Sequence, residues 1–179
     1  MSAIETVNLS RGRVLTVEID DCAQEPYADD KGVRIVVLHR HWTNPAAGLL
    51  DTVEDVQAFE AENDAPDSEW AIFELWVMDH SGRTFKAGAL GAGNPFGAGP
   101  YAQWDSGRVG VIALARAEWP AADLKTAQGV ADTYGAWAEG EVYQFVISNR
   151  RGDVLDSCGG FYSVAEALAT GRQEAKVKA

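Results

Sequence analysis

The sequence is poor in cysteine and in long hydrophobic runs, and each shortage excludes a class of protein. Its two cysteines, Cys22 and Cys158, are too few for a disulfide-stabilised scaffold and favour a reducing cytosol. No apolar run approaches the roughly 18 residues of a transmembrane helix, and we find no secretory signal segment. We therefore expect a cytoplasmic protein with no membrane association.

Basic residues are scarce relative to acidic ones. The 179 residues include 15 Lys and Arg against 27 Asp and Glu, which gives a net charge of −12. Residues 1–79 hold 17 acidic and 5 basic side chains, whereas residues 80–179 hold 10 of each. The whole excess thus lies in under half of the chain. A protein this acidic is a poor ligand for nucleic acid, so we expect no direct nucleic-acid binding.

The charge excess is densest in segment 51–79, which contains ten acidic residues and no Lys or Arg. One interpretation is a solvated helix face and loop that keep the protein in solution. The other is an electronegative docking face for a basic partner. The docking hypothesis assigns partner binding to eight side chains: Asp51, Glu54, Asp55, Glu60, Glu62, Asp64, Asp67 and Glu69.

Strand-like and helix-like segments follow one another without a repeat or a clear linker. Apolar alternation and apolar runs predict strands over 14–20, 33–42, 70–78, 83–86, 108–115, 142–148 and 154–155. Helices are predicted over 52–62, with Thr52 as N-cap and Asp55 three residues on, over 120–138, and after Ser163. The pattern predicts one α+β domain over residues 1–171, with a mixed or antiparallel sheet of about five to seven strands and about two to three helices. Residues 172–179 are expected to form a frayed tail.

Two features of the sequence could indicate a cofactor or metal site, but the evidence for each is weak. Segment 88–100 has five glycines and two prolines, but it lacks the strand–turn–helix context of a dinucleotide site. His39 and His41 would share one face of a strand, with His80 or Cys158 as a third metal ligand from afar. Zinc sites normally show closer supporting ligands. We therefore expect no cofactor and no metal, with the histidines at an exposed strand edge.

Cys158 is a candidate nucleophile because the glycine after it could free backbone N–H groups to hold an oxyanion. A catalytic thiol also needs a histidine to lower its pKa, and His80 is the candidate. The alternative, which we expect, is a small buried side chain at the end of a strand. Asp105 shows no partner for acid catalysis in the sequence. We therefore assign no catalytic residue.

Three blocks of residues agree in order and spacing with one known family. Residues 101–112 are similar to a P/Q-W-D-S-G-Q-V-G-F-I block, and residues 140–146 with 156–162 to a G-D-V-Y-G-x-x-V … D-S-C-W-G-F-Y-G block. Residues 78–82 are similar to a Y-D-H-S-G turn. The chain thus resembles a family of small uncharacterised proteins of bacteriophages and plasmids, although Gly159 replaces a family Trp and Ser163 a family Gly. The family-motif turns contain Asp79, His80, Trp104, Asp105, Ser106, Asp156, Ser157 and Cys158.

The resemblance implies a mobile-element protein in the cytoplasm of a bacterial host. Many host defence proteins bind nucleic acid through basic grooves, where an acidic face can compete. We therefore predict a non-enzymatic binding protein that inhibits a host defence protein with a basic surface, of the anti-CRISPR or antirestriction type. The alternative is a small thiol- or metal-dependent hydrolase, whose converging side chains would be His39, His41, His80, Asp105, Asp156 and Cys158.

Overall fold

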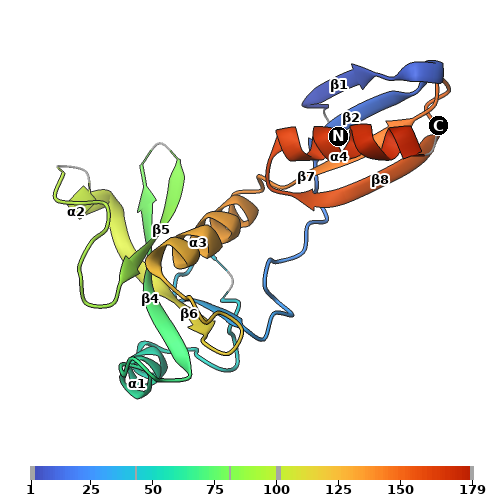
Figure 1. Cartoon of the computed structure of the whole chain (residues 1–179). Helices are drawn as coiled ribbons and strands as arrows, with labels where there is room; N and C mark the ends of the chain where they lie inside the picture. The colour runs from blue at the N-terminus through green and yellow to red at the C-terminus, as the bar shows by residue number, and fades with distance from the viewer. Residues whose placement is uncertain (1–2, 43, 81, 100–101, 178–179) are drawn as a thin grey trace. The chain divides into compact units, whose positions relative to one another are not determined.

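The computed structural model describes residues 3–42, 44–80, 82–99 and 102–177. Within these residues, eight strands form two four-stranded antiparallel sheets, which confirms the α+β class (Figure 1). The strands exceed the five to seven expected and are divided between two sheets. Contacts between Cα atoms likewise divide the chain into two compact units, one made of Met1–Gln24 and Ala136–Ala179 and the other of Glu25–Gly135.

The first unit is an antiparallel sheet covered on one face by a helix. Its strands, in spatial order, are β1 (Glu5–Asn8), β2 (Val14–Ile19), β7 (Tyr143–Ser148) and β8 (Val154–Phe161), and its helix is α4 (Val164–Val177). A short 3-10 turn, Ser10–Gly12, joins β1 to β2. Helix α4 packs on β2, β7 and β8 and buries Leu15, Val17, Phe145 and Ile147.

The second unit is a sheet with helices on both faces. Its strands, in spatial order, are β3 (Val33–Val37), β6 (Ser106–Ala115), β4 (Trp70–Asp79) and β5 (Arg83–Ala89). Its helices are α1 (Val53–Glu62), the single turn α2 (Ala102–Asp105) and α3 (Leu124–Ala138), of which α3 runs past residue 135. Helix α1 buries Phe59 against Trp70 on one face. On the opposite face of the sheet, Tyr134 of α3 packs edge-on against Phe85 of β5.

The helix signals in the sequence are confirmed at two N-termini. Thr52 and Asp55 form the expected capping box at the start of α1. The Ser163 Oγ accepts a hydrogen bond from the Glu166 N–H, 3.1 Å away, at the start of α4. Helix α3 starts later than residue 120 because Asp123 acts as its cap and accepts from the Thr126 N–H at 2.8 Å.

Several element boundaries differ from the expectation. Strand β3 ends at Val37, so residues 38–42 are not a strand. Residues 172–177 belong to α4 rather than to a frayed tail, and Ala175 is buried in the first unit. Strand β8 extends to Phe161, well past the two residues expected. Among the helices that the structure describes, none has both the length and the apolarity that crossing a membrane requires.

Candidate functional site

The eight acidic residues of the docking hypothesis lie on helix α1 and on the segments at its two ends. We call this set the acidic surface: Asp51, Glu54, Asp55, Glu60, Glu62, Asp64, Asp67 and Glu69. Seven of the eight are exposed to solvent, and Glu60 is half-buried. The buried positions of α1 are Val56 and Phe59, so the helix turns its apolar side to the sheet and leaves its charges outside.

The capping box fixes the N-terminal end of the acidic surface. The Asp55 Oδ2 accepts a hydrogen bond from the Thr52 N–H at 3.0 Å, and the Thr52 Oγ1 accepts from the Asp55 N–H at 3.1 Å. The Thr52 hydroxyl also donates to Asp55 Oδ2 at 2.7 Å, and this bond, together with the one from the Thr52 N–H, lowers the pKa of the Asp55 carboxyl, which keeps it ionised at neutral pH. The Asp51 carboxylate accepts from the Gly48 N–H at 2.9 Å. The first turn of α1 is therefore both rigid and negative.

Little positive charge offsets the acidic surface. In the part of the chain that the structure describes, Glu60 is its one member that pairs with a basic side chain, that of Arg108. Asp51 and Asp55 bond to backbone N–H groups, which satisfies their oxygens without cancelling their charge. The field of the remaining carboxylates therefore extends into solvent.

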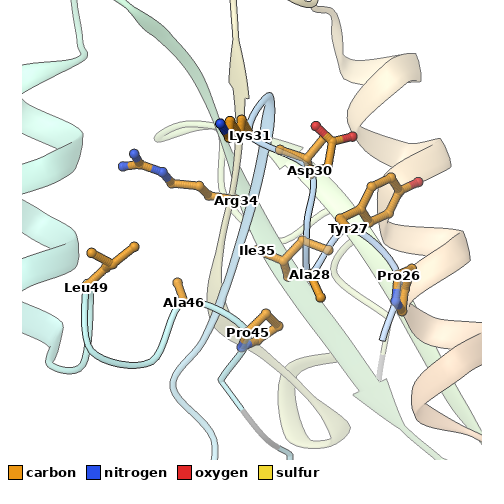
Figure 2. A pocket seen from close by; sticks show the side chains of 11 residues that line it. Pro26, Tyr27, Ala28, Asp30, Lys31, Arg34, Ile35, Pro45, Ala46 and Leu49 are labelled. Carbon is orange, nitrogen blue, oxygen red and sulfur yellow. The ribbon is translucent and has the colours of Figure 1, made fainter. Parts of the chain in front are cut away.

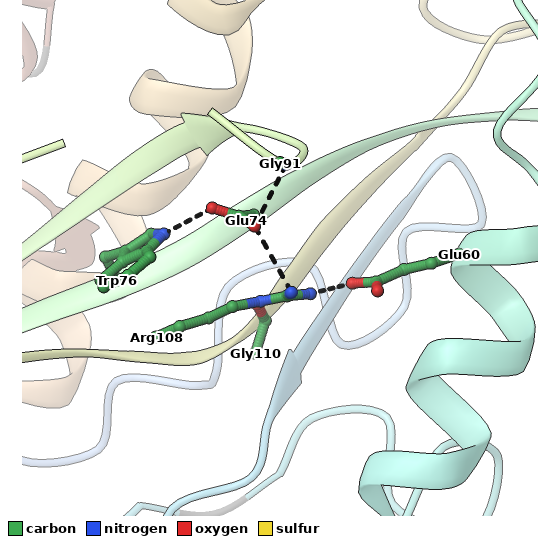
Figure 3. A network of polar contacts seen from close by, with 6 residues as sticks. All are labelled: Glu60, Glu74, Trp76, Gly91, Arg108 and Gly110. Atoms are coloured by element: carbon green, nitrogen blue, oxygen red, sulfur yellow. Dashed lines mark hydrogen bonds and ion pairs between the residues drawn. The ribbon is translucent and has the colours of Figure 1, made fainter. Parts of the chain in front are cut away.

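A buried carboxylate lies on strand β4 and is connected to α1 through Arg108 (Figure 3). The Glu74 side chain is 7% exposed. It accepts hydrogen bonds from the Trp76 Nε1–H at 2.9 Å and from the Gly91 N–H at 3.3 Å. Its Oε1 lies 3.4 Å from Nη1 of Arg108, whose Nη2 contacts Glu60. Figure 3 shows the Arg108 side chain extending between the two carboxylates, so it ties α1 to the sheet.

This network carries one net negative charge, because one guanidinium serves two carboxylates. Partial burial lowers the pKa of Arg108 from its ordinary value, but a guanidinium stays protonated in proteins. Beside the network, a groove of about 190 Å³ opens between α1 and β6. It is lined by Leu38, Val53, Val56, Gln57, Glu60, Arg108, Val109 and Gly110. The acidic surface thus borders a small, mostly apolar hollow.

Two of the three family-motif turns meet in the second unit. Strand pairing places Met78 opposite Ser106, which brings the residues after β4 close to α2. As a result, His80 Nδ1 lies 2.8 Å from Asp105 Oδ2, with side chains 46% and 30% exposed. Asp105 therefore has a partner that its sequence position did not indicate. Near this pair Asp79 contacts Arg83 at 3.4 Å, and Trp104 is 80% exposed.

The third family-motif turn is a strand in the first unit. Asp156, Ser157 and Cys158 lie within β8, and Cys158 is exposed, so the expectation of a buried side chain at a strand end is wrong. The Asp20 carboxylate accepts from the Gly160 N–H at 3.0 Å and would clash with a Cβ at Gly159. All three histidines belong to the other unit.

His39 and His41 follow β3 rather than lying on it, so the expectation of a shared strand face is wrong. The His39 Nδ1 instead accepts from the His41 N–H at 3.3 Å, and their rings lie 5.2 Å apart. Desolvation, followed by the charges of His41 and Arg40, lowers the pKa of His39. A search of the described residues finds no group of three His, Cys, Asp or Glu side chains that could hold a metal ion.

Sequence reasoning missed the network of Glu74 and Arg108. It counted Glu74 among the ten acids of segment 51–79, although the structure buries it. A signal was present, because Glu74 alternates with Trp70, Ile72 and Trp76 and so belongs to the face of β4 that α1 covers. A charge on such a face requires a partner, and Arg108 is that partner.

Comparison with known proteins found no matching family, no matching curated protein and no matching solved structure. The resemblance to bacteriophage and plasmid proteins therefore rests on the sequence blocks alone.

Proposed function

We propose that the protein is a non-enzymatic binding protein whose acidic surface docks onto a basic surface of another protein. The observation that carries this proposal is the exposure of seven of eight neighbouring carboxylates, with a single basic partner, Arg108, among the described residues. Uncancelled like charges repel one another and lower stability. A partner that supplies Lys and Arg side chains would remove that repulsion.

The apolar features beside the charges support docking over simple solvation. Val53 is 56% exposed at the start of α1, and Leu49 is 68% exposed shortly before it. Tight interfaces usually combine a desolvated anchor with a polar rim. Here the groove beside Val53 could accept one side chain of the partner as the anchor, and the carboxylates would form the polar rim. The charges would then set the rate of encounter and the groove the lifetime of the complex.

The partner class follows from the resemblance to bacteriophage and plasmid proteins. A mobile element benefits when it disables a bacterial defence protein, and many such proteins hold DNA or RNA in basic grooves. The proposed activity is therefore competition with nucleic acid for such a groove in the bacterial cytoplasm, as an anti-CRISPR or antirestriction protein would do.

The proposal is tested by capture from a bacterial lysate with matched baits. The test variant carries E54Q, E62Q, D64N and D67N, all at exposed positions. The control variant carries E5Q, D21N, E118Q and E141Q, which are also exposed and change the net charge equally. Bound proteins are identified by mass spectrometry and assayed for nucleic-acid binding with and without the wild-type protein.

We expect wild type and control to capture the same nucleic-acid-binding protein and the test variant to lose it. Wild type should also displace nucleic acid from that protein. Equal capture by all three baits would contradict the role of the acidic surface. Captured protein that keeps its nucleic acid would contradict the inhibitory activity.

The pair of His80 and Asp105 favours a second candidate, a small hydrolase. A carboxylate bonded to Nδ1 orients a histidine, so that its Nε2 could act as a general base. The variants H80Q and D105N, assayed on ester and phosphoester substrates, test this candidate. Hydrolysis by wild type that both variants lose would support it, and no hydrolysis by wild type would dismiss it.

A further inference from the structure

A second hollow, separate from the groove beside α1, lies along strand β3 in the same unit (Figure 2). Its volume is about 370 Å³, which is within the range of small-molecule sites. Its apolar walls come from the loop before β3, from β3 itself and from the segment after it: Pro26, Ala28, Val33, Ile35, Pro45, Ala46 and Leu49. The polar side chains in the wall are those of Tyr27, Asp30, Lys31 and Arg34.

Positive charge gathers in this pocket, although the surrounding sequence is acidic. Residues 1–79 contain only five basic side chains, and two of them, Lys31 and Arg34, line the pocket. With Asp30 included, the pocket carries one net positive charge. Asp30 is itself engaged, because its Oδ1 accepts from the Gly32 N–H at 2.8 Å. The pocket therefore suits a ligand with a single negative charge.

Arg34 is held in place for such a ligand. Its guanidinium lies 4.2 Å from the ring centroid of Trp70 and 5.8 Å from that of Phe59, both buried aromatic residues. Stacking occupies the face of the guanidinium and leaves its N–H groups, which lie in the plane, available to acceptors. The Arg34 side chain makes no hydrogen bond or ion pair with any residue that the structure describes. A half-buried guanidinium with unused N–H donors is suited to bind a carboxylate.

Strand β3 adds backbone groups to the pocket because it is the edge strand of its sheet. The Gly32 C=O and the Leu38 N–H form hydrogen bonds with β6. Every second residue between them therefore directs its backbone N–H and C=O groups toward β6 as well. The Val37 N–H points the other way and donates to Asn44 Oδ1 at 3.1 Å. By the same alternation, Val33 and Ile35 turn their backbone N–H and C=O groups to the open edge. The pocket thus combines apolar walls, a fixed cation and backbone hydrogen-bonding groups.

The backbone of Tyr27 gives an independent sign of a built site. Its φ of +66° places a bulky non-glycine residue in the left-handed region, which is strained. Such strain persists where the surrounding structure enforces it, and it gathers at ligand sites. The conformation is fixed in part by the Asp30 N–H, which donates to the Tyr27 C=O at 3.0 Å. In Figure 2 the Tyr27 ring stands on one side of the pocket and Arg34 and Leu49 on the other.

From these features we infer that the pocket along β3 binds a small amphipathic carboxylate, whose carboxylate contacts Arg34 and Lys31 and whose apolar body contacts Ile35 and Ala46. The inference is independent of the proposed docking function, because none of the residues of the acidic surface lines this pocket. Binding of a carboxylate is also a property that the net negative charge of the whole chain would not suggest.

The test uses phenylbutyrate as the probe and follows the backbone amide NMR signals of the isotope-labelled full chain. Phenylbutanol and phenylbutylamine are the neutral and cationic controls. The variant R34M keeps an aliphatic stem over Trp70 and removes the charge. K31M, at an exposed position, is the second variant, and R40M removes an exposed cation outside the pocket.

We expect phenylbutyrate to shift the amide signals of residues 27–35 and 46–49, and phenylbutanol to bind about tenfold more weakly or worse. R34M should weaken phenylbutyrate binding by about tenfold or more, K31M by a smaller factor, and R40M not at all. If R34M does not fold, the comparison of phenylbutyrate binding by K31M and by R40M tests the inference in its place. Acid and alcohol binding equally, K31M and R34M binding like wild type, or no shift at about 10 mM phenylbutyrate would each overturn the inference.

Discussion

Replacing Arg108 with methionine removes the one guanidinium that contacts both Glu60 and Glu74. Methionine keeps most of the aliphatic stem, so the change isolates the charge. Glu74 would then be a carboxylate that is 7% exposed, with hydrogen bonds from Trp76 and Gly91 but no ion pair. We expect this variant to be clearly less stable than wild type.

The magnitude follows from the burial of the two partners. Removing one partner of a fully buried ion pair costs about 3–5 kcal/mol. Arg108 is 33% exposed, so water screens part of its charge, and Glu74 keeps two donors. We therefore expect R108M to lower the free energy of unfolding by about 2–3 kcal/mol. Replacing Glu74 with glutamine in the same chain removes the uncompensated charge and should restore at least about 1 kcal/mol.

Urea unfolding followed by tryptophan fluorescence measures these free energies, with R40M as the control for loss of an exposed cation. The four proteins R108M, E74Q, the double variant and wild type form a double-mutant cycle. A loss below about 1 kcal/mol in R108M, or no recovery in the double variant, would show that the carboxylate does not depend on the guanidinium.

Three further outcomes are expected. T52A should lower the unfolding free energy by about 1 kcal/mol in urea titrations at pH 7. Because bonds from Thr52 lower the pKa of Asp55 in the folded state, the part of this contribution that comes from the ionised carboxylate is present above the ordinary aspartate pKa and is lost as pH falls through the lowered folded value. The T52A deficit should therefore shrink at low pH, and a deficit that stays constant down to pH 2 would refute the assignment. Calorimetry should give one unfolding transition, as one cooperative domain requires, and two separated transitions would mean that the units of residues 1–24 with 136–179 and of residues 25–135 unfold independently. Cys158 should react with a thiol reagent at the rate of a model thiol, and much faster stoichiometric labelling would indicate an activated nucleophile.

Local signals in the sequence predicted local structure well. Thr52 and Asp55 were enough to place the start of α1, because a capping box involves only four consecutive residues. Strands β1 and β8 were missed or shortened because most of their residues are exposed, so the apolar alternation is absent. The division into two sheets could not be predicted, since it depends on β2 pairing with β7 from the far end of the chain.

The candidate site divides in the same way. Counting charges was enough to find the acidic surface, because an exposed carboxylate is solvated by water and needs no partner residue. The contact of His80 with Asp105 could not be found from the sequence, since 24 residues lie between the two and only the register of β4 with β6 brings them together. Glu74 was grouped with exposed acids because its partner Arg108 comes from a different strand.

The most direct test of the docking proposal is the rate at which the captured partner associates with the protein at different salt concentrations. Stopped-flow measurements between about 50 and 300 mM salt would compare wild type, the variant E54Q/E62Q/D64N/D67N and the equally charged control E5Q/D21N/E118Q/E141Q. We predict that the first variant associates about tenfold more slowly at the lowest salt and with a shallower salt dependence, while the control follows wild type. Equal rates and equal salt slopes for all three proteins would mean that the acidic surface serves only to keep α1 in water.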